Sequence, residues 1–280
     1  MRQFKVLLDN LAFGEGPRWH GGKLYYSDMH LHTVNAVDLE GRNTVVAEVA
    51  AWPSGLGWLP DGRMLVVSMT DRKLLRQENG GLKQHADLSG LASYHCNDMV
   101  VDSRGRAYVG NFGYDIISGA SQKPAELIMV ETDGAARVVA RDLRFPNGAV
   151  ITPDGKTLVV GESMGHRLSA FDVAADGTLA NRRVWADLGE GVPDGIALDA
   201  EGSIWVASPF THELLRVKQG GQVTERIKRE QMPIACMLGG PARRTLFLLT
   251  AESIDPDECR AKRNSRIETT EVEVAGAGLP

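Results

Sequence analysis

The sequence predicts an all-β protein in which residues 1–280 form a single six-bladed β-propeller. Two observations lead to this prediction. A tight turn followed by a short apolar strand occurs six times at intervals of 40 to 50 residues, and the segments before the first copy and after the last copy also have the composition of strands. Repeats of this length, built from short strands and turns, are typical of propeller blades. A pair of β-sandwiches, the alternative, would not repeat six times in phase.

Each of the six copies is marked by a residue at the end of its turn. These marker positions are 22, 62, 105, 155, 202 and 243, so successive copies are 40, 43, 50, 47 and 41 residues apart. The apolar strands that follow occupy residues 23–28, 63–68, 106–111, 156–162, 203–208 and 245–250. Further short strands and Gly- or Asp-rich turns complete each copy, which predicts three or four strands per blade.

The two end segments are expected to close the ring. Residues 3–9 (QFKVLLD) and residues 266–274 (RIETTEVEV) both have the composition of strands and lie outside the six copies. A ring with an open edge strand would be prone to aggregation. We therefore expect the two segments to pair with each other in the last blade.

A second position recurs seven or eight residues before each marker, and in four copies it holds a side-chain oxygen suited to binding a cation. These four residues are Glu15, Asn97, Asn147 and Asp194, whereas Ser54 and Ala235 occupy the position in the other two copies. In a propeller the first strand of each blade lines the central channel, so the starting ends of these strands meet at one mouth. Asp194 is therefore expected at the channel, although the same tripeptide, Pro-Asp-Gly, is placed in hairpin turns at 60–62 and 153–155.

Two carboxylates and two amide oxygens form an all-oxygen set that suits a hard divalent cation. The two acids would repel each other without a cation between them. We expect Ca²⁺ in the central channel, with Mg²⁺, Mn²⁺, Zn²⁺ and Fe²⁺ as alternatives. Taken singly, Pro-Asp-Gly and Pro-Asn-Gly are common turns and Glu15 would be a surface residue, so the prediction depends on four such residues sharing one position in the repeat.

Four segments resemble a known family over nearly the whole chain. They are FGEGPRW (13–19), RFPNGAVITPDGKTLVVGES (144–163), GVPDGIALDAEGSIWVA (191–207) and GGPARRTLFLLTA (239–251), and they resemble the regucalcin (senescence-marker)/gluconolactonase family. The resemblance implies a six-bladed propeller, a divalent metal in the central channel and, commonly, hydrolysis of sugar lactones. It also implies that Glu15, Asn147 and Asp194 are metal ligands and that Asn97 is a fourth ligand or contacts substrate.

The chain departs from this family in one motif. Sugar-lactonase members usually have Arg-x-Asn-Asp-Gly where residues 95–99 read His-Cys-Asn-Asp-Met. In the family that arginine contacts substrate hydroxyls, whereas His95 is shorter, is largely neutral near neutral pH and lacks the forked donor of arginine. We expect His95 to face substrate, either as an aid to proton transfer or as part of the wall. The departure argues against a polyhydroxylated sugar lactone and leaves the metal chemistry intact.

Three further segments are expected to lie outside the regular strands. Residues 111–126 are too long for a hairpin and are expected to overhang the channel mouth, with Phe112, Tyr114 and Ile116 as substrate contacts; the alternative is a mobile surface loop. Residues 28–32 contain two histidines and are expected to be a solvated strand end rather than a metal site. Residues 252–266 are rich in charge and are expected to be an exposed loop.

The residues and the resemblance together predict a divalent-metal-dependent hydrolase of a cyclic ester, that is, a lactonase. Asp194 would be a metal ligand that also orients or deprotonates the attacking water, and Asn97 would donate to the carbonyl oxygen or help to hold the metal. Two other functions stay open. One is a phosphotriesterase or fluorophosphatase that uses the same metal set, and the other is a calcium-binding propeller without catalysis.

Composition limits the partners. Lys and Arg number 31 against 36 Asp and Glu, for a net charge of −5, and the absence of a basic run argues against nucleic acid. The sequence has no apolar stretch long enough for a membrane span and no signal-peptide pattern. The three cysteines, Cys96, Cys236 and Cys259, lack metal-binding spacing. We expect a cytoplasmic monomer or dimer that acts on a small-molecule lactone or ester.

Overall fold

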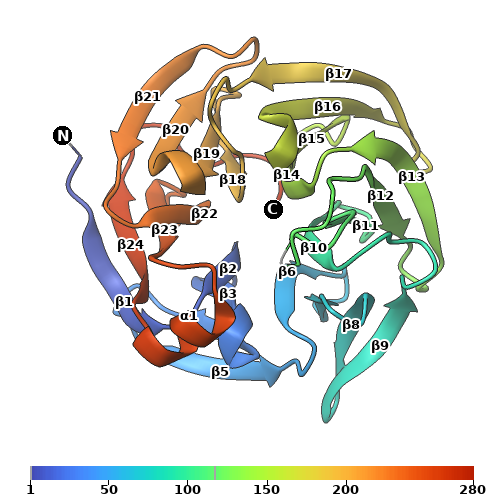
Figure 1. Cartoon of the computed structure of the whole chain (residues 1–280), viewed down its shortest axis with the longest axis horizontal. Helices are drawn as coiled ribbons and strands as arrows, with labels where there is room; N and C mark the ends of the chain where they lie inside the picture. Colours follow the sequence, from blue (N-terminus) through green and yellow to red (C-terminus); the bar gives the residue numbers. More distant parts are fainter. Residues whose placement is uncertain (1, 117) are drawn as a thin grey trace.

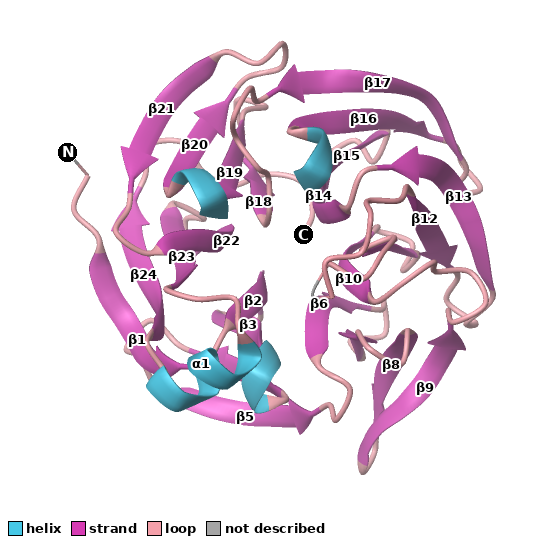
Figure 2. Ribbon diagram, in the orientation of Figure 1, coloured by secondary structure: helices cyan, strands magenta, loops and turns pink. Residues whose placement is uncertain are grey.

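The structure is a computed structural model that describes residues 2–116 and 118–280. It confirms the predicted all-β fold, because six four-stranded antiparallel sheets surround a central channel (Figure 1). The first strand of each blade lies beside the channel and the last strand lies at the outer edge. Figure 2 shows that strands make up nearly all of the regular structure.

The blades follow one another in chain order. The first blade contains β2 (Gly14–His20), β3 (Lys23–Asp28), β4 (Thr33–Val37) and β5 (Asn43–Glu48), and the second contains β6 (Pro53–Trp58), β7 (Met64–Ser68), β8 (Lys73–Glu78) and β9 (Gly81–Asp87). The third contains β10 (Cys96–Val101), β11 (Ala107–Asn111), β12 (Ala125–Val130) and β13 (Ala136–Leu143), and the fourth contains β14 (Pro146–Ile151), β15 (Thr157–Glu162), β16 (Arg167–Val173) and β17 (Leu179–Asp187). The fifth contains β18 (Ile196–Leu198), β19 (Ile204–Ser208), β20 (Glu213–Val217) and β21 (Val223–Lys228).

The sixth blade closes the ring as the sequence predicts. It contains β22 (Met232–Gly239), β23 (Thr245–Ala251), β24 (Ser265–Glu271) and, as its outer strand, β1 (Lys5–Leu11) from the start of the chain. β1 pairs antiparallel with β24, with Lys5 opposite Thr269. The ring of Trp19 in the first blade also stacks on Phe247 in the sixth, with 5.5 Å between ring centroids. Strand pairing and aromatic packing therefore both join the two ends of the circuit.

The six turn markers share one backbone conformation. Their φ angles are 82° at Gly22, 85° at Gly62, 87° at Gly105, 70° at Gly155, 75° at Gly202 and 52° at Arg243. Glycine adopts positive φ without steric cost, whereas a residue with a Cβ is strained there. This conformation explains why five of the six copies carry glycine at the marker.

The innermost strands approach each other so closely at the axis that side chains would not fit between them. A Cβ built on Gly148 would lie 2.6 Å from the Asp194 carbonyl oxygen, and one built on Gly195 would lie 2.5 Å from the Cβ of Ala235. A Cβ on Gly16 would lie 2.8 Å from the carbonyl oxygen of Ser54. The small residues Ser54 and Ala235 thus serve the packing between blades, and neither is among the residues that line the axial cavity.

The C-terminal segment crosses the opposite end of the channel. Ile151 and Leu279 exchange two backbone hydrogen bonds, and the amide of Ala277 donates to the carbonyl oxygen of Leu198 at 2.9 Å. Ile151 ends β14 and Leu198 ends β18, whereas Asn147 and Asp194 lie near the starts of these strands. The segment therefore covers the mouth away from the predicted site, and Figure 1 places the C-terminus near the middle of the ring.

Residues 252–266 are largely exposed, as expected, but the expectation of a loop is wrong, because the segment contains the helix α1 (Pro256–Lys262). Asp255 is the N-cap and accepts a hydrogen bond from the Glu258 amide at 2.9 Å, and Pro256 occupies the first turn. An acidic N-cap followed by proline favours a helix start. The Cys259 side chain is buried beneath the helix, which anchors α1 beside the first blade's 3₁₀ turn η1 (Met29–Leu31).

We expect Gly55→Ala to lower the free energy of unfolding by about 2 kcal/mol, because over-packing at a site without free space has a cost of this size. The added Cβ would lie 2.4 Å from the Met99 amide nitrogen and 2.7 Å from Asp98 Oδ1. Gly90→Ala is the matched control, since a Cβ there meets no atom within 4 Å. Urea denaturation measures both, and an equal effect of the two substitutions would contradict the packing argument.

Candidate active site

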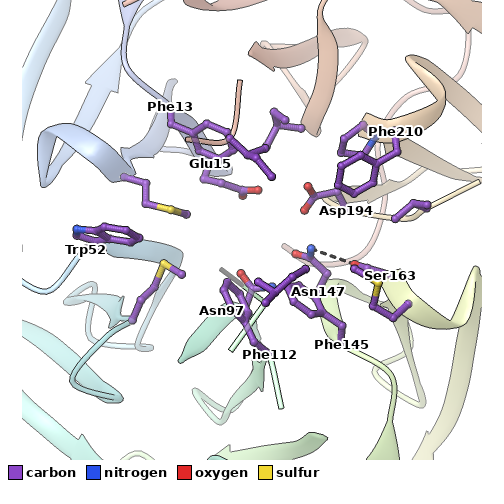
Figure 3. A pocket seen from close by; sticks show the side chains of 18 of the residues that line it. Phe13, Glu15, Trp52, Asn97, Phe112, Phe145, Asn147, Ser163, Asp194 and Phe210 are labelled. Atoms are coloured by element: carbon purple, nitrogen blue, oxygen red, sulfur yellow. Dashed lines mark hydrogen bonds between the residues drawn. The ribbon is translucent and has the colours of Figure 1, made fainter. Parts of the chain in front are cut away.

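The structure brings the four oxygen-bearing residues of the repeat to one place. Glu15, Asn97 and Asn147 are each the second residue of an innermost strand, and Asp194 lies two residues before β18. All four line the same cavity at the axis. In Figure 3 their side chains come from separate blades and point toward a common centre, with the carboxylates of Glu15 and Asp194 facing each other.

Irregular strand pairing places these side chains at the axis. The register shifts between Glu15 and Arg18 on β2, between Cys96 and Met99 on β10, and between Pro146 and Ala149 on β14. Such bulges redirect side chains from the regular alternation of a strand and occur often beside active sites. In the fifth blade the regular pairing starts only at Ile196, two residues after Asp194. The bulges therefore fall at the position that the repeat singles out.

The two site carboxyl groups are held in a setting that disfavours charge. Burial raises the pKa of Glu15 well above its ordinary value, and the charges of Asp194 and Asp98 raise it further. Burial also raises the pKa of Asp194, to about 7, although hydrogen bonding to Glu15 and Asn147 opposes the shift. Among the described residues no Lys or Arg forms an ion pair with either group. A cation between them would supply the missing positive charge.

Asn147 is oriented by a side chain that sequence reasoning missed. Its Nδ2 donates to Ser163 Oγ at 3.2 Å (Figure 3), and the Ser163 hydroxyl donates in turn to the carbonyl oxygen of Pro193 at 2.6 Å. This chain of hydrogen bonds engages the nitrogen of the Asn147 amide and leaves Oδ1 for a ligand. Pro193 directly precedes Asp194, so the same chain of hydrogen bonds also joins the fourth blade to the fifth beside the site.

Asn97 is positioned through the acid that follows it. Asp98 Oδ1 and Arg18 Nη2 are 2.6 Å apart, and both side chains are at most 5% exposed. Arg18 also donates through Nε to the carbonyl oxygen of Leu56 at 3.1 Å, so it joins the first three blades. Nδ2 of Asn97 is buried and has no hydrogen-bond partner in the part of the chain that the structure describes. The site therefore retains the unsatisfied donor of Asn97 as well as two acids without a basic partner among the described residues.

The donor set fits a hard divalent cation. Within residues 2–116 and 118–280, no group of three or more His, Cys, Asp or Glu side chains is arranged to hold a metal ion. An ion at the axis would therefore depend on the amide oxygens of Asn97 and Asn147 beside the carboxylates of Glu15 and Asp194. Oxygen ligands of this kind suit Ca²⁺, Mg²⁺ or Mn²⁺ better than Zn²⁺, which favours nitrogen and sulfur.

The cavity beside these residues has about 160 Å³ of free space and a largely apolar wall. Four wall residues stand two positions before the recurrent site position of their blade, and they are Phe13, Trp52, Phe145 and Val192. This second periodicity is visible in the sequence and would have identified them. Other parts of the wall are Met29, Met69, Met164, Pro209, Phe210, Ile234, Ile254 and Pro256.

The predicted substrate contacts divide into two groups. Phe112 and Ile116 line the cavity, and the ring of Phe112 stacks on Phe145 with 4.4 Å between centroids. His95 stacks instead on Tyr94 at 4.1 Å and is not among the lining residues. Tyr114 is also absent from the lining and packs edge-on against Phe145 at 6.4 Å. His95 stands two positions before Asn97, where other blades have a wall residue, but in the third blade Phe112 lines the cavity instead. The role of His95 stays a prediction.

The expectation that residues 28–32 form a solvated strand end is wrong. His30 lies in the 3₁₀ turn η1, is 3% exposed and lines the cavity. Its ring lies 5.1 Å from that of Trp52 and 5.1 Å from that of Phe13. Burial lowers the pKa of His30 to about 4, so the imidazole is neutral near neutral pH. Its Nδ1 has no hydrogen-bond partner among the described residues.

Fold and site together define a six-bladed propeller with an acid- and amide-lined axial cavity. The model of the family described as "SMP-30/Gluconolactonase/LRE-like region" matches residues 13–252. The chain belongs to this family, which confirms the resemblance seen in the sequence.

Named relatives include lactonases that match most of the chain. A 6-deoxy-6-sulfogluconolactonase of Pseudomonas putida is 24% identical over 248 residues, which cover 86% of this chain and 84% of the relative. Pentonolactonase XacC of Haloferax volcanii is 26% identical over 263 residues, which cover 88% of this chain and 84% of the relative. These relatives support lactone hydrolysis at the level of the family.

Solved structures share the fold. A regucalcin from Agrobacterium tumefaciens, described as a calcium-binding protein, superposes with a TM-score of 0.83 and 24% identity over 100% of this chain and 97% of that one. A gluconolactonase from Xanthomonas campestris gives a TM-score of 0.76 and 21% identity over 100% of this chain and 90% of that one. At such identities the likeness establishes the propeller architecture alone. None of the helices in the described residues is long and apolar enough to cross a membrane.

We expect Arg18→Met to lower the free energy of unfolding by about 3 kcal/mol, because it leaves the buried Asp98 carboxylate without its partner. The double variant Arg18→Met/Asp98→Asn removes both charges and should recover part of this loss. A double-mutant cycle in urea measures the coupling between the two residues. A double variant no more stable than Arg18→Met would contradict the pairing.

Proposed function

We propose that the protein is a divalent-metal-dependent lactonase that opens a cyclic ester in the axial cavity. The convergence of Glu15, Asn97, Asn147 and Asp194 beside this cavity is the observation that supports the proposal. The lactonases among the relatives agree with it at the family level. A purely structural ion would be enclosed by protein, whereas here a cavity adjoins the ligands, which favours an enzyme over a calcium-binding scaffold.

Glu15, Asn147 and Asp194 would hold the cation, with Asn97 as a fourth ligand or a substrate contact. All the available donors are oxygens, which suits Ca²⁺, the ion we favour, and also Mg²⁺ and Mn²⁺. When bound, such an ion supplies Lewis-acid polarisation of an ester carbonyl and stabilises negative charge on its oxygen. The hydrogen bond to Ser163 keeps Asn147 oriented for this task.

Asp194 is the residue suited to activate water. It is one of the two buried acids and lines the open cavity, so its carboxylate lies beside the space in which a lactone and the attacking water would bind. Water attacks the carbonyl carbon, the ring C–O bond breaks, and the proton taken from the water passes to the departing ring oxygen. The product is the open-chain hydroxy acid. As a substrate contact, Asn97 would donate a hydrogen bond to the carbonyl oxygen through Nδ2, which has no partner among the described residues.

Asp194→Asn should reduce kcat/KM for lactone hydrolysis by about 10³-fold, the contribution expected of a general base. Asp154→Asn is the matched control, because Asp154 stands in the same Pro-Asp-Gly tripeptide but is exposed in a hairpin turn. A pH-indicator assay with lactones and a fluorophosphate, run on chelated and reloaded protein, measures both variants. Full activity of Asp194→Asn would refute the assignment, and hydrolysis of the fluorophosphate alone would favour the phosphotriesterase alternative.

Cation binding should stabilise the fold. At roughly a hundredfold excess over its dissociation constant, Ca²⁺ should raise the free energy of unfolding by about 2.7 kcal/mol, because it binds the folded state alone. Glu15→Gln should weaken this response, whereas Glu190→Gln, a change at an exposed acid, should retain it. Thermal melts with Ca²⁺, Mg²⁺, Mn²⁺, Zn²⁺ and Fe²⁺ after chelation measure the effect. An undiminished response in Glu15→Gln would place the ion elsewhere.

A further inference from the structure

The wall of the axial cavity is poorly suited to a polyhydroxylated substrate. Of the 20 described residues that line it, the polar ones are Glu15, His30, Asn97, Asn147, Ser163 and Asp194, and none is Lys or Arg. All the others are aliphatic, aromatic, methionine or proline side chains.

Most of these polar groups are already engaged. Glu15, Asn147 and Asp194 face the proposed cation, and Ser163 uses its hydroxyl between Asn147 and the Pro193 carbonyl. The donor of Asn97 is directed to the ester itself under the proposed function, which leaves His30 as the remaining polar group in the wall. A sugar lactone would bury several hydroxyl groups without partners, and each unpaired hydroxyl carries a free-energy penalty.

The mouth of the cavity is apolar as well. Phe210 in η3 (Pro209–Thr211) and Ile254 before α1 both line the cavity, yet their side chains are 57% and 55% exposed. Figure 3 shows Phe210 on the side of Asp194, and Phe112 and Phe145 on the side of Asn97 and Asn147. Apolar surface therefore extends from solvent to both sides of the acid and amide groups. Exposed apolar side chains gathered at a cavity are typical of a binding site for an apolar ligand.

We propose that the cavity selects a lactone that carries an uncharged apolar substituent, alkyl or aryl, in preference to a sugar lactone. This inference depends on the proposed function for the reaction and on the wall for the substrate class. The free space of about 160 Å³ is close to that of apolar protein cavities, about 150 Å³, that hold benzene. A substituent of roughly that size fits. If it carries a polar group, that group can contact His30.

The test compares two families of lactones on the metal-loaded protein. The apolar family contains unsubstituted δ-valerolactone, its propyl, pentyl and heptyl derivatives, and dihydrocoumarin. The sugar family contains glucono-δ-lactone and a pentono-γ-lactone. We expect kcat/KM to rise about threefold to fourfold for each methylene that enters the cavity, the factor given by burial of one methylene. The heptyl lactone should exceed glucono-δ-lactone by at least about a hundredfold.

A rim variant checks that the wall is responsible. Phe210→Ala should lower the ratio of kcat/KM for the heptyl lactone to that for unsubstituted δ-valerolactone by about threefold to tenfold. Val184→Ala is the matched control, because Val184 is also 57% exposed but lies on the outer strand β17. An unchanged preference in Phe210→Ala, or an equal loss in the control, would count against the proposed wall.

Binding of 2-hexylcyclopentanone separates the two proposals, because this ketone keeps a ring carbonyl and an alkyl chain but has no ester to cleave. Calorimetry should show binding with a negative heat-capacity change, the mark of apolar burial. Faster hydrolysis of the sugar lactones would overturn the inference and keep the proposed lactonase. If the protein hydrolyses no lactone, the proposed function fails, and the ketone result alone then decides whether the cavity takes apolar ligands.

Discussion

The close approach of the innermost strands at the propeller axis is the constraint on which the site depends. Gly148 meets the backbone of Asp194, and Gly195 meets Ala235, at distances that leave no space for a Cβ. Only this contact allows short side chains from separate blades, such as Asn147 and Asp194, to reach one point. The glycine beside a site residue is therefore as much a part of the site as the residue itself. A wider ring would keep the same blades but separate the oxygen atoms.

Charge is distributed unevenly around this axis. Asp98 is buried but paired with Arg18 at 2.6 Å, so it joins blades and holds the neighbouring Asn97 in place. Glu15 and Asp194 have no such partner among the described residues, and burial raises the pKa of both. A buried acid that is neutralised by a basic group, such as Asp98, thus has a structural role, whereas a buried acid without such a partner is available to a ligand. Glu15 and Asp194 are therefore the acids available to the proposed cation, whereas Arg18 neutralises Asp98.

The ligand positions and the wall are set by different residues of the same strands. Residues at the recurrent site position supply oxygen, whereas those two positions earlier, Phe13, Trp52 and Phe145, supply apolar surface. The second set can therefore change without a change in the first, because the fold and the oxygen-bearing residues do not determine the wall. In the third blade Phe112 lines the cavity, and the His95 ring lies 6.1 Å from the Phe112 ring.

The sequence alone determined the six blades, their closure by β1 and β24, and the four oxygen-bearing residues, because glycine turns and strand periodicity are local properties that recur in phase. It did not reveal the bulges that direct Glu15 and Asn147, the hydrogen bond from Asn147 to Ser163, or the burial of His30. The bulges and the hydrogen bond form between neighbouring segments of one blade, whereas His30 is buried where the first blade meets Trp52 of the second. Contacts between residues far apart in the chain leave no local pattern, so only the tertiary structure decided that η1, η3 and α1 contribute His30, Phe210 and Pro256 to the cavity.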